Sequence, residues 1–450
     1  MKARIERKKA LIERLLHPLH NLLQYQSSSG IAIFICVAVA MAWANIDQED
    51  YHAFWGTELA FSLGPFSIRE SLHVWINDAL MAIFFFGVGL EIKRELLAGE
   101  LASFRKAVLP VAAAVGGMAI PAIIYLLFNA NSEAASGWGI PMATDIAFSI
   151  GILSLLGRQA PLSLKIFLTA LAIVDDIGGV LVIALVYTSE VSGMDLVHGI
   201  FFLGLLILGN IIGIRSQAFY SIISIGGLWL AFFFSGIHPT IAGILAAFAI
   251  PGRVKLNEGL FLKNLETLTQ LFKSSKPIKG SFISENQLEI LETIKEVADD
   301  AETPLQKVEY ALNWFISFVV LPLFALANTG IHLHGRVWEI MLHPVSIGIG
   351  AGLVVGKFVG IVGVSKVMVR LGFAELPAGI SWNHIYGVAL LAGVGFTMSL
   401  FITELAFTDE RLIYVAKIGI LTASLIAGIL GYTYLRIMTK KDALMVNLFQ

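Results

Sequence analysis

Residues 171–180 read LAIVDDIGGV and place two adjacent aspartates, Asp175 and Asp176, in the middle of a long apolar run. The run extends from residue 162 to about residue 187, which is the length of a helix that crosses a bilayer. A carboxylate at that depth costs roughly 2.5 to 3.5 kcal/mol on insertion scales, so intramembrane acids usually face a watery cavity or a partner. The pair therefore predicts an ion or proton path; the alternative is a polar kink beside the glycines that follow.

The composition of the whole chain is that of an integral membrane protein. Of its 450 residues, 57% are hydrophobic and only 14% are charged. The mean hydropathy is +0.79, which is higher than that of soluble proteins. The single cysteine excludes an internal disulfide. We predict an all-α membrane protein with a single domain, residues 1–450, and about twelve transmembrane helices. These are expected at residues 29–46, 73–90, 107–128, 138–157, 162–187, 195–213, 217–235, 238–252, 309–329, 344–366, 384–407 and 411–436.

Lysine and arginine residues fall unevenly on the connections between these stretches, and cytoplasmic loops carry an excess of them. One face of the membrane receives most of them, whereas the opposite face receives only Arg69, Arg336 and Arg411. This asymmetry predicts that both termini are cytoplasmic. Two lysines, Lys357 and Lys417, fit neither face because they lie inside apolar stretches.

Three segments are predicted to lie outside the membrane. Residues 11–23 form either a basic amphipathic helix on the cytoplasmic surface or a solvated tail. Residues 47–70 predict an extracytoplasmic hairpin whose strands lie between residues 51 and 68, and a hairpin this small is expected to pair with another subunit. Residues 253–307 predict a polar cytoplasmic insertion between the eighth and ninth helices, with one amphipathic helix over residues 285–297.

Two of the apolar stretches contain residues that disfavour a continuous helix. Residues 139–145 read GIPMATD, which combines a proline and small residues with Thr144 and Asp145. Residues 393–399 read GVGFTMS at a comparable place in the second half of the chain. Interrupted spans in two halves indicate a transporter site, because broken helices direct their end dipoles and free carbonyls at an ion. Glycines that allow close helix packing are the alternative explanation.

Four charged residues are expected at membrane depth: Asp145, Asp175, Asp176 and Lys357. The lysine can pair with one aspartate and leave the others for a cation or protons. Burial and ion pairing act on protonation in opposite directions, so such a site can titrate near neutral pH. Carboxylate, threonine and carbonyl oxygens suit small alkali cations, no transition-metal or phosphate-binding motif is found, and neither a cofactor nor nucleic acid is expected. The sequence predicts a carrier in which Na⁺ or Li⁺ and H⁺ compete for the same carboxylates.

The second predicted helix carries charges at both ends. Asp78, near the outer end, is either an interfacial cap or part of an ion path. Glu91, Lys93 and Glu95, at the cytoplasmic end, form either a solvated interfacial cluster or a site of regulation.

Two other functions use membrane carboxylates. An intramembrane aspartic protease needs two carboxylates on facing helices, whereas Asp175 and Asp176 are adjacent and cannot converge. A cation channel is compatible with the composition, but two broken helices and a buried lysine favour alternating access. The protein is therefore not expected to be an enzyme.

Five stretches, LAIVDDIGGV, PMATDIAFSIGIL, WINDALMAIFFFGVGLEIKREL, GVGFTMSLFI and SGIHPTIAGI, resemble the NhaA family of bacterial sodium/proton antiporters. The similarity covers nearly the whole chain except residue 253 to about residue 303. It implies inverted repeats whose two broken helices cross at mid-membrane, an architecture that this family itself exemplifies. It also implies a homodimer in the inner membrane of a bacterial cell.

The resemblance implies a role for individual residues. Asp176 would be the principal ion ligand with Asp175 and Asp145 beside it, Thr144 would lie at the helix break, and Lys357 would pair with Asp175. Exchange would be electrogenic and pH-dependent, with more protons entering than sodium ions leaving, and would serve sodium and pH homeostasis.

The chain departs from the family pattern at the start of the ninth helix. Where pH-responsive members carry two histidines, this chain has Tyr310 and Asn313, although Glu309 is kept. Neither replacement titrates near neutral pH. We therefore expect the aspartates themselves to supply most of the pH response, with Glu309 and the charged end of the second helix as a possible site of pH regulation. The cytoplasmic insertion is also longer than in the family pattern.

Overall fold

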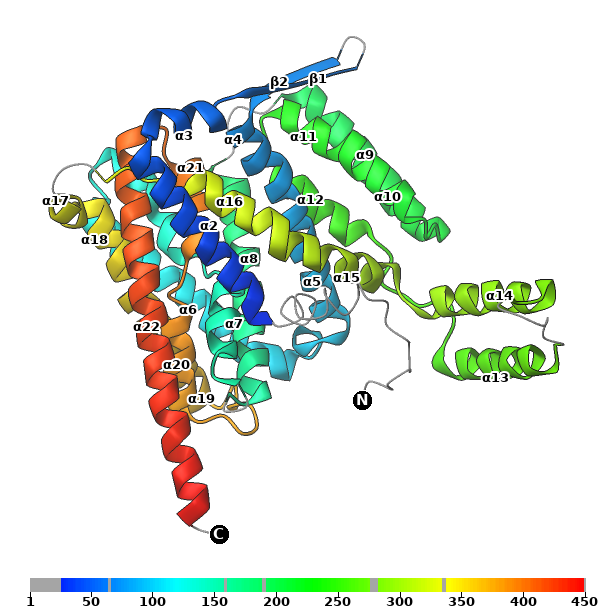
Figure 1. The fold of residues 1–450 in the computed structure, drawn as a ribbon. Helices are drawn as coiled ribbons and strands as arrows, with labels where there is room; N and C mark the ends of the chain where they lie inside the picture. The colour runs from blue at the N-terminus through cyan, green and yellow to red at the C-terminus, as the bar shows by residue number, and fades with distance from the viewer. Residues whose placement is uncertain are drawn as a thin grey trace. The chain divides into compact units, whose positions relative to one another are not determined.

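The structure is a computed structural model that describes residues 26–63, 66–157, 160–187, 192–275, 282–333 and 337–448. Most of these residues are helical (Figure 1). The predicted amphipathic segment at residues 11–23 lies outside the described residues. The helices of the apolar stretches are α2 (Gln26–Ile46), α4 (Leu72–Val74), η1 (Trp75–Leu80), α5 (Met81–Ala98), α6 (Phe104–Asn129), η3 (Glu133–Met142), α7 (Ile146–Ser154), α8 (Leu162–Val186), α9 (Gly193–Ile212), α10 (Gln217–Ile223), η5 (Ser224–Trp229), α11 (Leu230–Ser235), α12 (Pro239–Ala249), α15 (Pro304–Phe315), η6 (Ile316–Val320), α16 (Leu321–Asn328), α18 (Pro344–Ala351), η7 (Gly352–Gly356), α19 (Lys357–Arg370), α20 (Trp382–Leu391), α21 (Phe396–Ala406) and α22 (Glu410–Leu448).

The helices confirm a multi-pass membrane protein. Within the described residues, nine helices are long and apolar enough to cross a membrane, or ten if α20 and α21, which are bent by 46°, count as one span. The two remaining predicted stretches correspond to η3 with α7, which are interrupted, and to α12, which has only 11 residues. A count of twelve membrane crossings therefore stays a prediction.

The contacts between helices divide the chain into two compact units. Unit 1 consists of Met1–Phe84, Glu100–Ser189 and Phe315–Gln450, and it contains both interrupted stretches. Unit 2 consists of Phe85–Gly99 and Glu190–Trp314, and so includes the insertion.

In unit 1, glycines bring α6 and α19 unusually close together. A Cβ atom on Gly360 would lie 2.1 Å from the carbonyl oxygen of Gly116, so only hydrogen fits between the two backbones. Lys357 precedes Gly360 by about one helical turn and is fully buried. The close approach of α6 thus places a lysine in the interior of the unit.

The predicted hairpin is present but shorter than expected. Strands β1 (Glu58–Leu63) and β2 (Phe66–Ser71) pair antiparallel, whereas α3 (Gln48–Trp55) is helical. The prediction of a strand beginning near residue 51 was wrong because Asp47 caps a helix: its side chain accepts a hydrogen bond from the Asp50 amide at 2.9 Å.

Helix α3 also covers the end of α16. The Tyr51 hydroxyl donates to the carbonyl oxygens of Leu326 and Ala327, at 2.8 and 2.9 Å. Burial raises the pKa of Tyr51, so the hydroxyl remains a proton donor at physiological pH. The alternation of polar and apolar residues that resembled a strand therefore belongs in part to a helix that caps another helix.

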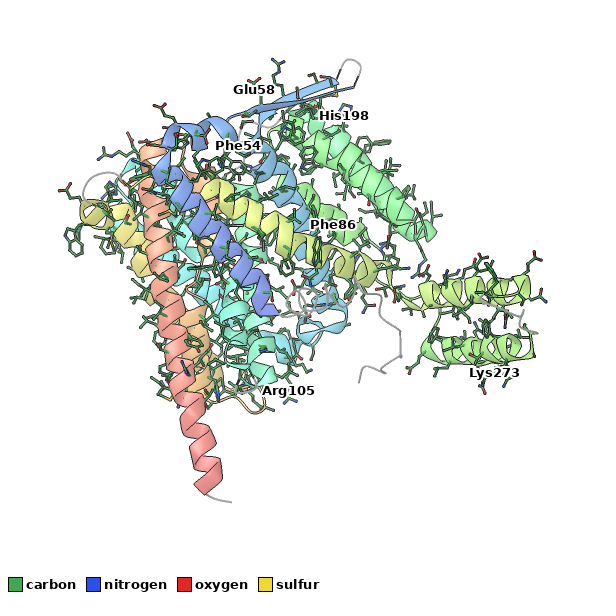
Figure 2. The ribbon with its side chains drawn as sticks, viewed as in Figure 1. Phe54, Glu58, Phe86, Arg105, His198 and Lys273 are labelled. Atoms are coloured by element: carbon green, nitrogen blue, oxygen red, sulfur yellow. The ribbon has the colours of Figure 1, made fainter. Side chains whose placement is uncertain are left out.

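The insertion contains two helices where one was predicted. Helix α14 (Glu285–Ala301) includes the predicted stretch and begins with a capping box at Ser284. Helix α13 (Glu258–Ser274) was missed, and it lies beside α14 (Figure 1). Its charged side chains face outward, as Figure 2 shows for Lys273.

Candidate ion-binding site

Two interrupted helices meet in unit 1. Residues 143–145 are extended between η3 and α7, and α20 and α21 are separated at residues 392–395. The amide of Asp145 donates to the carbonyl oxygen of Val394 at 2.7 Å. The Ser399 hydroxyl donates to the carbonyl oxygen of Ile140 at 2.8 Å. The two predicted breaks are confirmed, and each satisfies backbone groups that the other leaves free.

Glycine is required at the second break because the backbones approach so closely. A Cβ atom at Gly393 would lie 2.4 Å from the carbonyl oxygen of Leu353 in η7. A Cβ atom at Gly395 would lie 2.9 Å from the carbonyl oxygen of Ala143. The glycines therefore serve close packing and the break together.

Asp145 joins the N-terminal ends of two half-helices. One carboxylate oxygen accepts from the Phe148 amide at 3.0 Å, which is the N-cap bond of α7. The other accepts from the amide and the hydroxyl of Thr397, at 3.0 and 2.5 Å, in the first turn of α21. The negative charge of Asp145 thus faces the positive ends of two helix dipoles.

Asp175 lies in the middle of α8 and is paired. Its Oδ2 atom accepts from Lys357 Nζ at 2.5 Å, and both side chains are fully buried. The Thr144 hydroxyl lies 2.7 Å from the same oxygen and 2.8 Å from the carbonyl oxygen of Ala392. The structure therefore brings together three predicted residues, from the first break, from α8 and from α19.

The second carboxylate oxygen of Asp175 is buried and accepts no hydrogen bond from the described residues. Asp176 is also buried, with 5% of its surface exposed, and lies within electrostatic range of Lys357. The described residues contain no group of three acidic, histidine or cysteine side chains close enough to hold a metal ion together. A cation bound here would consequently need hydroxyl or carbonyl oxygens as additional ligands.

The remaining predicted residues lie elsewhere. Asp78 is part of η1 in unit 1. In unit 2, the guanidinium of Arg94 pairs with Glu309 at 2.7 Å, with Glu95 at 3.1 Å and more distantly with Glu91 at 3.8 Å. Lys93 does not join this cluster, and instead donates to the carbonyl oxygens of Phe248 and Ile250 at the end of α12. The predicted regulatory carboxylates therefore share an arginine.

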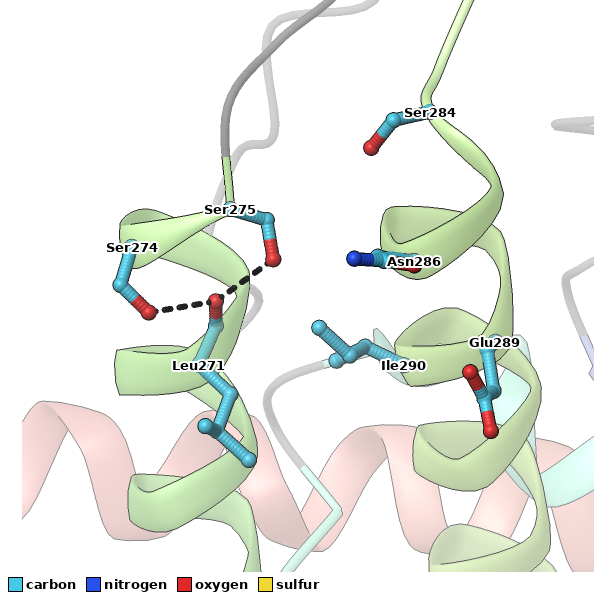
Figure 3. A pocket seen from close by; sticks show the side chains of 7 residues that line it. All are labelled: Leu271, Ser274, Ser275, Ser284, Asn286, Glu289 and Ile290. Carbon is cyan, nitrogen blue, oxygen red and sulfur yellow. Dashed lines mark hydrogen bonds between the residues drawn. The ribbon is translucent and has the colours of Figure 1, made fainter.

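A pocket of about 550 Å³ lies between α13 and α14 in unit 2 (Figure 3). The hydroxyls of Ser274 and Ser275 on its wall both donate to the carbonyl oxygen of Leu271, so they are already engaged. Among the described residues that line it, Glu289 is the only charged one. The described lining of this pocket contains no buried ion pair like that of Asp175 and Lys357.

Comparison with known proteins agrees with this geometry. Residues 20–435 match the family described as Na⁺/H⁺ antiporter 1. The chain belongs to that family. It is 43% identical over 433 residues to the Na⁺/H⁺ antiporter NhaA of Oleidesulfovibrio alaskensis, covering 95% of this chain and 96% of the relative. It is 44% identical over 423 residues to NhaA 2 of Syntrophotalea carbinolica (94% and 96%) and 44% identical over 429 residues to NhaA of Wolinella succinogenes (94% and 94%).

Sequence reasoning missed two residues that organise the charged groups of this family member. Thr397 gives Asp145 two of its hydrogen bonds, and the signal was a threonine just after the second break. Arg94 joins three glutamates, and the signal was an arginine surrounded by acids at the end of an apolar helix. Both side chains were quoted within motifs, but the sequence alone did not show their partners.

Proposed function

We propose that the chain exchanges Na⁺, or Li⁺, for H⁺ across a bacterial inner membrane as a secondary transporter. Membership of the Na⁺/H⁺ antiporter 1 family and the names of the relatives support this function. The observation that carries it is the fully buried pair of Asp175 and Lys357 beside the contact of two helix breaks. A buried ion pair is costly to maintain, and intramembrane charges of this kind mark ion pathways.

The hydrogen bonds around Thr144 suggest where a proton is held. Its hydroxyl has one hydrogen but lies near two acceptors, Asp175 Oδ2 and the carbonyl oxygen of Ala392. Both contacts are satisfied at once if Asp175 carries a proton and donates to Thr144, while Thr144 donates to Ala392. An ionised Asp175 leaves only one of the two contacts with a full hydrogen bond. The arrangement therefore suits a carboxyl group that exchanges a proton.

Exchange follows from competition for these oxygens. When Asp175 and Asp176 are ionised, their carboxylates can hold a sodium ion together with the oxygens at the break near Thr144. Sodium would reduce the attraction between Asp175 and Lys357, and a proton on either aspartate would remove a ligand. Because Na⁺ and H⁺ cannot occupy the same carboxylate together, the site carries one or the other, which is the requirement for antiport.

Several further features belong to this proposal. The protein would have twelve membrane-spanning helices in one transporter domain, with inverted repeats and the helix breaks near mid-membrane. Both termini and the insertion would be cytoplasmic, and the β1–β2 hairpin would be extracytoplasmic and join two subunits. Exchange would be electrogenic and pH-dependent. Asp78 would line the ion path, and Glu91, Glu95 and Glu309, with Lys93 nearby, would contribute to pH regulation.

An intramembrane protease fits the site less well. Its two catalytic carboxylates must face one another, whereas Asp175 and Asp176 are consecutive on α8. The carboxylate of Asp145 is engaged by three donors from Phe148 and Thr397. Antiport is the better explanation because it uses a paired lysine and does not need a free acid dyad.

The test is sodium-driven proton movement in vesicles that contain the purified protein. Added Na⁺ should dissipate an established pH gradient, and Asp176→Asn should abolish this response while the protein still folds, because the amide preserves shape but removes a charge and a proton site. The matched control is Asp195→Asn, a half-buried aspartate in the first turn of α9 whose carboxylate accepts a hydrogen bond from Ser192. The proposal fails if Na⁺ leaves the gradient of the wild type unchanged at every pH from about 6 to about 9. Sodium flux without proton counter-movement would indicate a channel.

A further inference from the structure

The second lysine inside an apolar stretch, Lys417, also has an acidic partner. Its Nζ atom on α22 lies 2.7 Å from Glu404 Oε1 on α21, and the two side chains are only 15% and 17% exposed. Glu404 follows Thr397 by seven residues, or about 10 Å along the helix. Helix α21 therefore contacts Asp145 in its first turn and Lys417 near its other end.

Close to this pair lies a network of His73, Asn77 and Asn328. The Asn328 amide nitrogen donates to the Phe324 carbonyl oxygen at 3.0 Å and to Asn77 Oδ1 at 2.9 Å. Asn328 Oδ1 lies 3.1 Å from His73 Nε2. The Asn77 amide nitrogen lies 3.4 Å from both ring nitrogens of His73, Nδ1 and Nε2. The network joins α4 and η1 to the end of α16.

These contacts determine which nitrogen of His73 carries the proton. A backbone carbonyl can only accept, so Phe324 fixes the orientation of the Asn328 amide, and Asn328 in turn fixes that of Asn77. His73 Nε2 must therefore donate to Asn328, which leaves Nδ1 as the ring nitrogen that can accept from Asn77. The network fits a neutral imidazole, because a second proton on Nδ1 would face the two hydrogens of the Asn77 amide.

Asn77 lies within a π-helical turn. Helix η1 contains both Asn77 and Asp78, and isolated π turns within α-helices occur frequently at functional sites. If a protonated His73 displaced the Asn77 amide, the change would begin inside this turn. The same turn carries Asp78, the acid proposed to line the ion path.

The charged groups around His73 offer its protonated form another partner. Three charged or titratable side chains act on His73 electrostatically: Glu404 of α21, Lys417 of α22 and His52 of α3. Asp78 lies five residues further along the chain, and Glu70 is within electrostatic range of Asp78. Glu404 is the carboxylate already held by Lys417. A positive charge on His73 would therefore compete with Lys417 for Glu404 and alter the contact between α21 and α22.

We propose that His73 is a second protonation site of the antiporter, separate from the aspartates, and that its neutral form supports turnover. The inference rests on the proposed Na⁺/H⁺ exchange. Protonation would break the Asn77 contact in η1 and weaken the Glu404–Lys417 pair, and Glu404 belongs to α21, which begins at the second helix break. Because the imidazole is not an ion ligand, sodium would not compete with this proton directly.

The test is the pH profile of the exchange rate at low and at saturating Na⁺. In the pH profile, the inflection due to the aspartates should move to lower pH as the Na⁺ concentration rises, whereas the inflection due to His73 should stay at the same pH. A histidine goes from about one-tenth to about nine-tenths protonated over two pH units centred on its pKa. The wild-type rate at saturating Na⁺ should therefore fall about tenfold over that interval on acidification, and in His73→Gln it should fall less than about twofold.

The control is His198→Gln, the same substitution at an exposed histidine on α9 (Figure 2); it should keep the wild-type profile. His73→Leu gives a second variant suited to an apolar span if the glutamine destabilises the fold. A His73 variant whose profile superimposes on the wild type overturns the inference, and so does a wild type without a sodium-independent inflection. Absence of any exchange in the wild type would instead overturn the proposed function.

Discussion

Replacing Lys357 by alanine is the change with the largest effect expected on stability. The side chain is fully buried, and its ammonium group pairs with Asp175 at 2.5 Å. Without it, the one partner left to the Asp175 Oδ2 atom among the described residues is the hydroxyl of Thr144. Removing one partner of a buried pair typically costs about 3–5 kcal/mol, because a charge stays uncompensated at depth.

The cost should depend on pH. At low pH, Asp175 can take up a proton and no uncompensated charge remains, so the destabilisation should be smaller than at high pH. A joint Asp175→Asn and Lys357→Gln change should recover part of the loss at high pH, because it removes both charges and keeps polar groups in place. The coupling energy should lie within about 0.5–3 kcal/mol, the usual range for contacting residues.

The assay is equilibrium unfolding in mixed detergent micelles, with both single variants and the double variant measured at low and high pH. Lys106→Ala is the matched control, because Lys106 forms a surface pair with Glu100 at 3.4 Å, and such pairs contribute about 0–1 kcal/mol. Strictly additive effects of the Asp175 and Lys357 substitutions would refute the reasoning, as would a loss for Lys357→Ala no larger than that of the control.

Three further predictions concern the ion site, the helix breaks and the hairpin. Raising Na⁺ should move the aspartates' pH midpoint to lower pH, because sodium competes with protons; a profile whose only midpoint stays fixed would contradict this. Gly393→Ala should lower the thermal unfolding temperature, because its Cβ would lie 2.4 Å from the Leu353 carbonyl oxygen, whereas Gly363→Ala, with nothing within 4 Å, should not. Deleting residues 64–65 should favour monomers by light scattering and leave transport measurable; an unchanged mass would remove the hairpin from the dimer contact.

The sequence predicted the interruptions of the helices well because their causes are local. Proline removes a backbone donor and glycine weakens a helix whatever the surroundings, so residues 139–145 and 393–399 could be identified directly. Hydrophobic length likewise located nine of the other ten predicted stretches, whereas α12 has only 11 residues. The error at α3 (Gln48–Trp55) arose because a short helix and a strand both tolerate mixed polar and apolar residues, and the cap at Asp47 decided between them.

Partners of the buried charges could not be predicted from the residues alone, because they depend on how distant helices approach. From the sequence, Lys417 could be assigned to neither side of the membrane, and only the structure shows that it pairs with Glu404. Asp145 was expected to hold an ion, yet Thr397 and the Phe148 amide already occupy its oxygens. The periodicity of a helix places a side chain on a face but does not say which helix covers that face.

Helix α21 gives the two proposed protonation sites a common element. Thr397 in its first turn contacts Asp145, and Glu404 near its other end contacts Lys417. If a proton on His73 changes sodium affinity through this helix, sodium binding must change the proton affinity of His73 by the same factor, because coupling between binding sites is reciprocal. The reciprocity does not extend to turnover rates. An effect of His73 on rate without an effect on sodium affinity would therefore place the coupling in the movement of α21 and not in the occupied site.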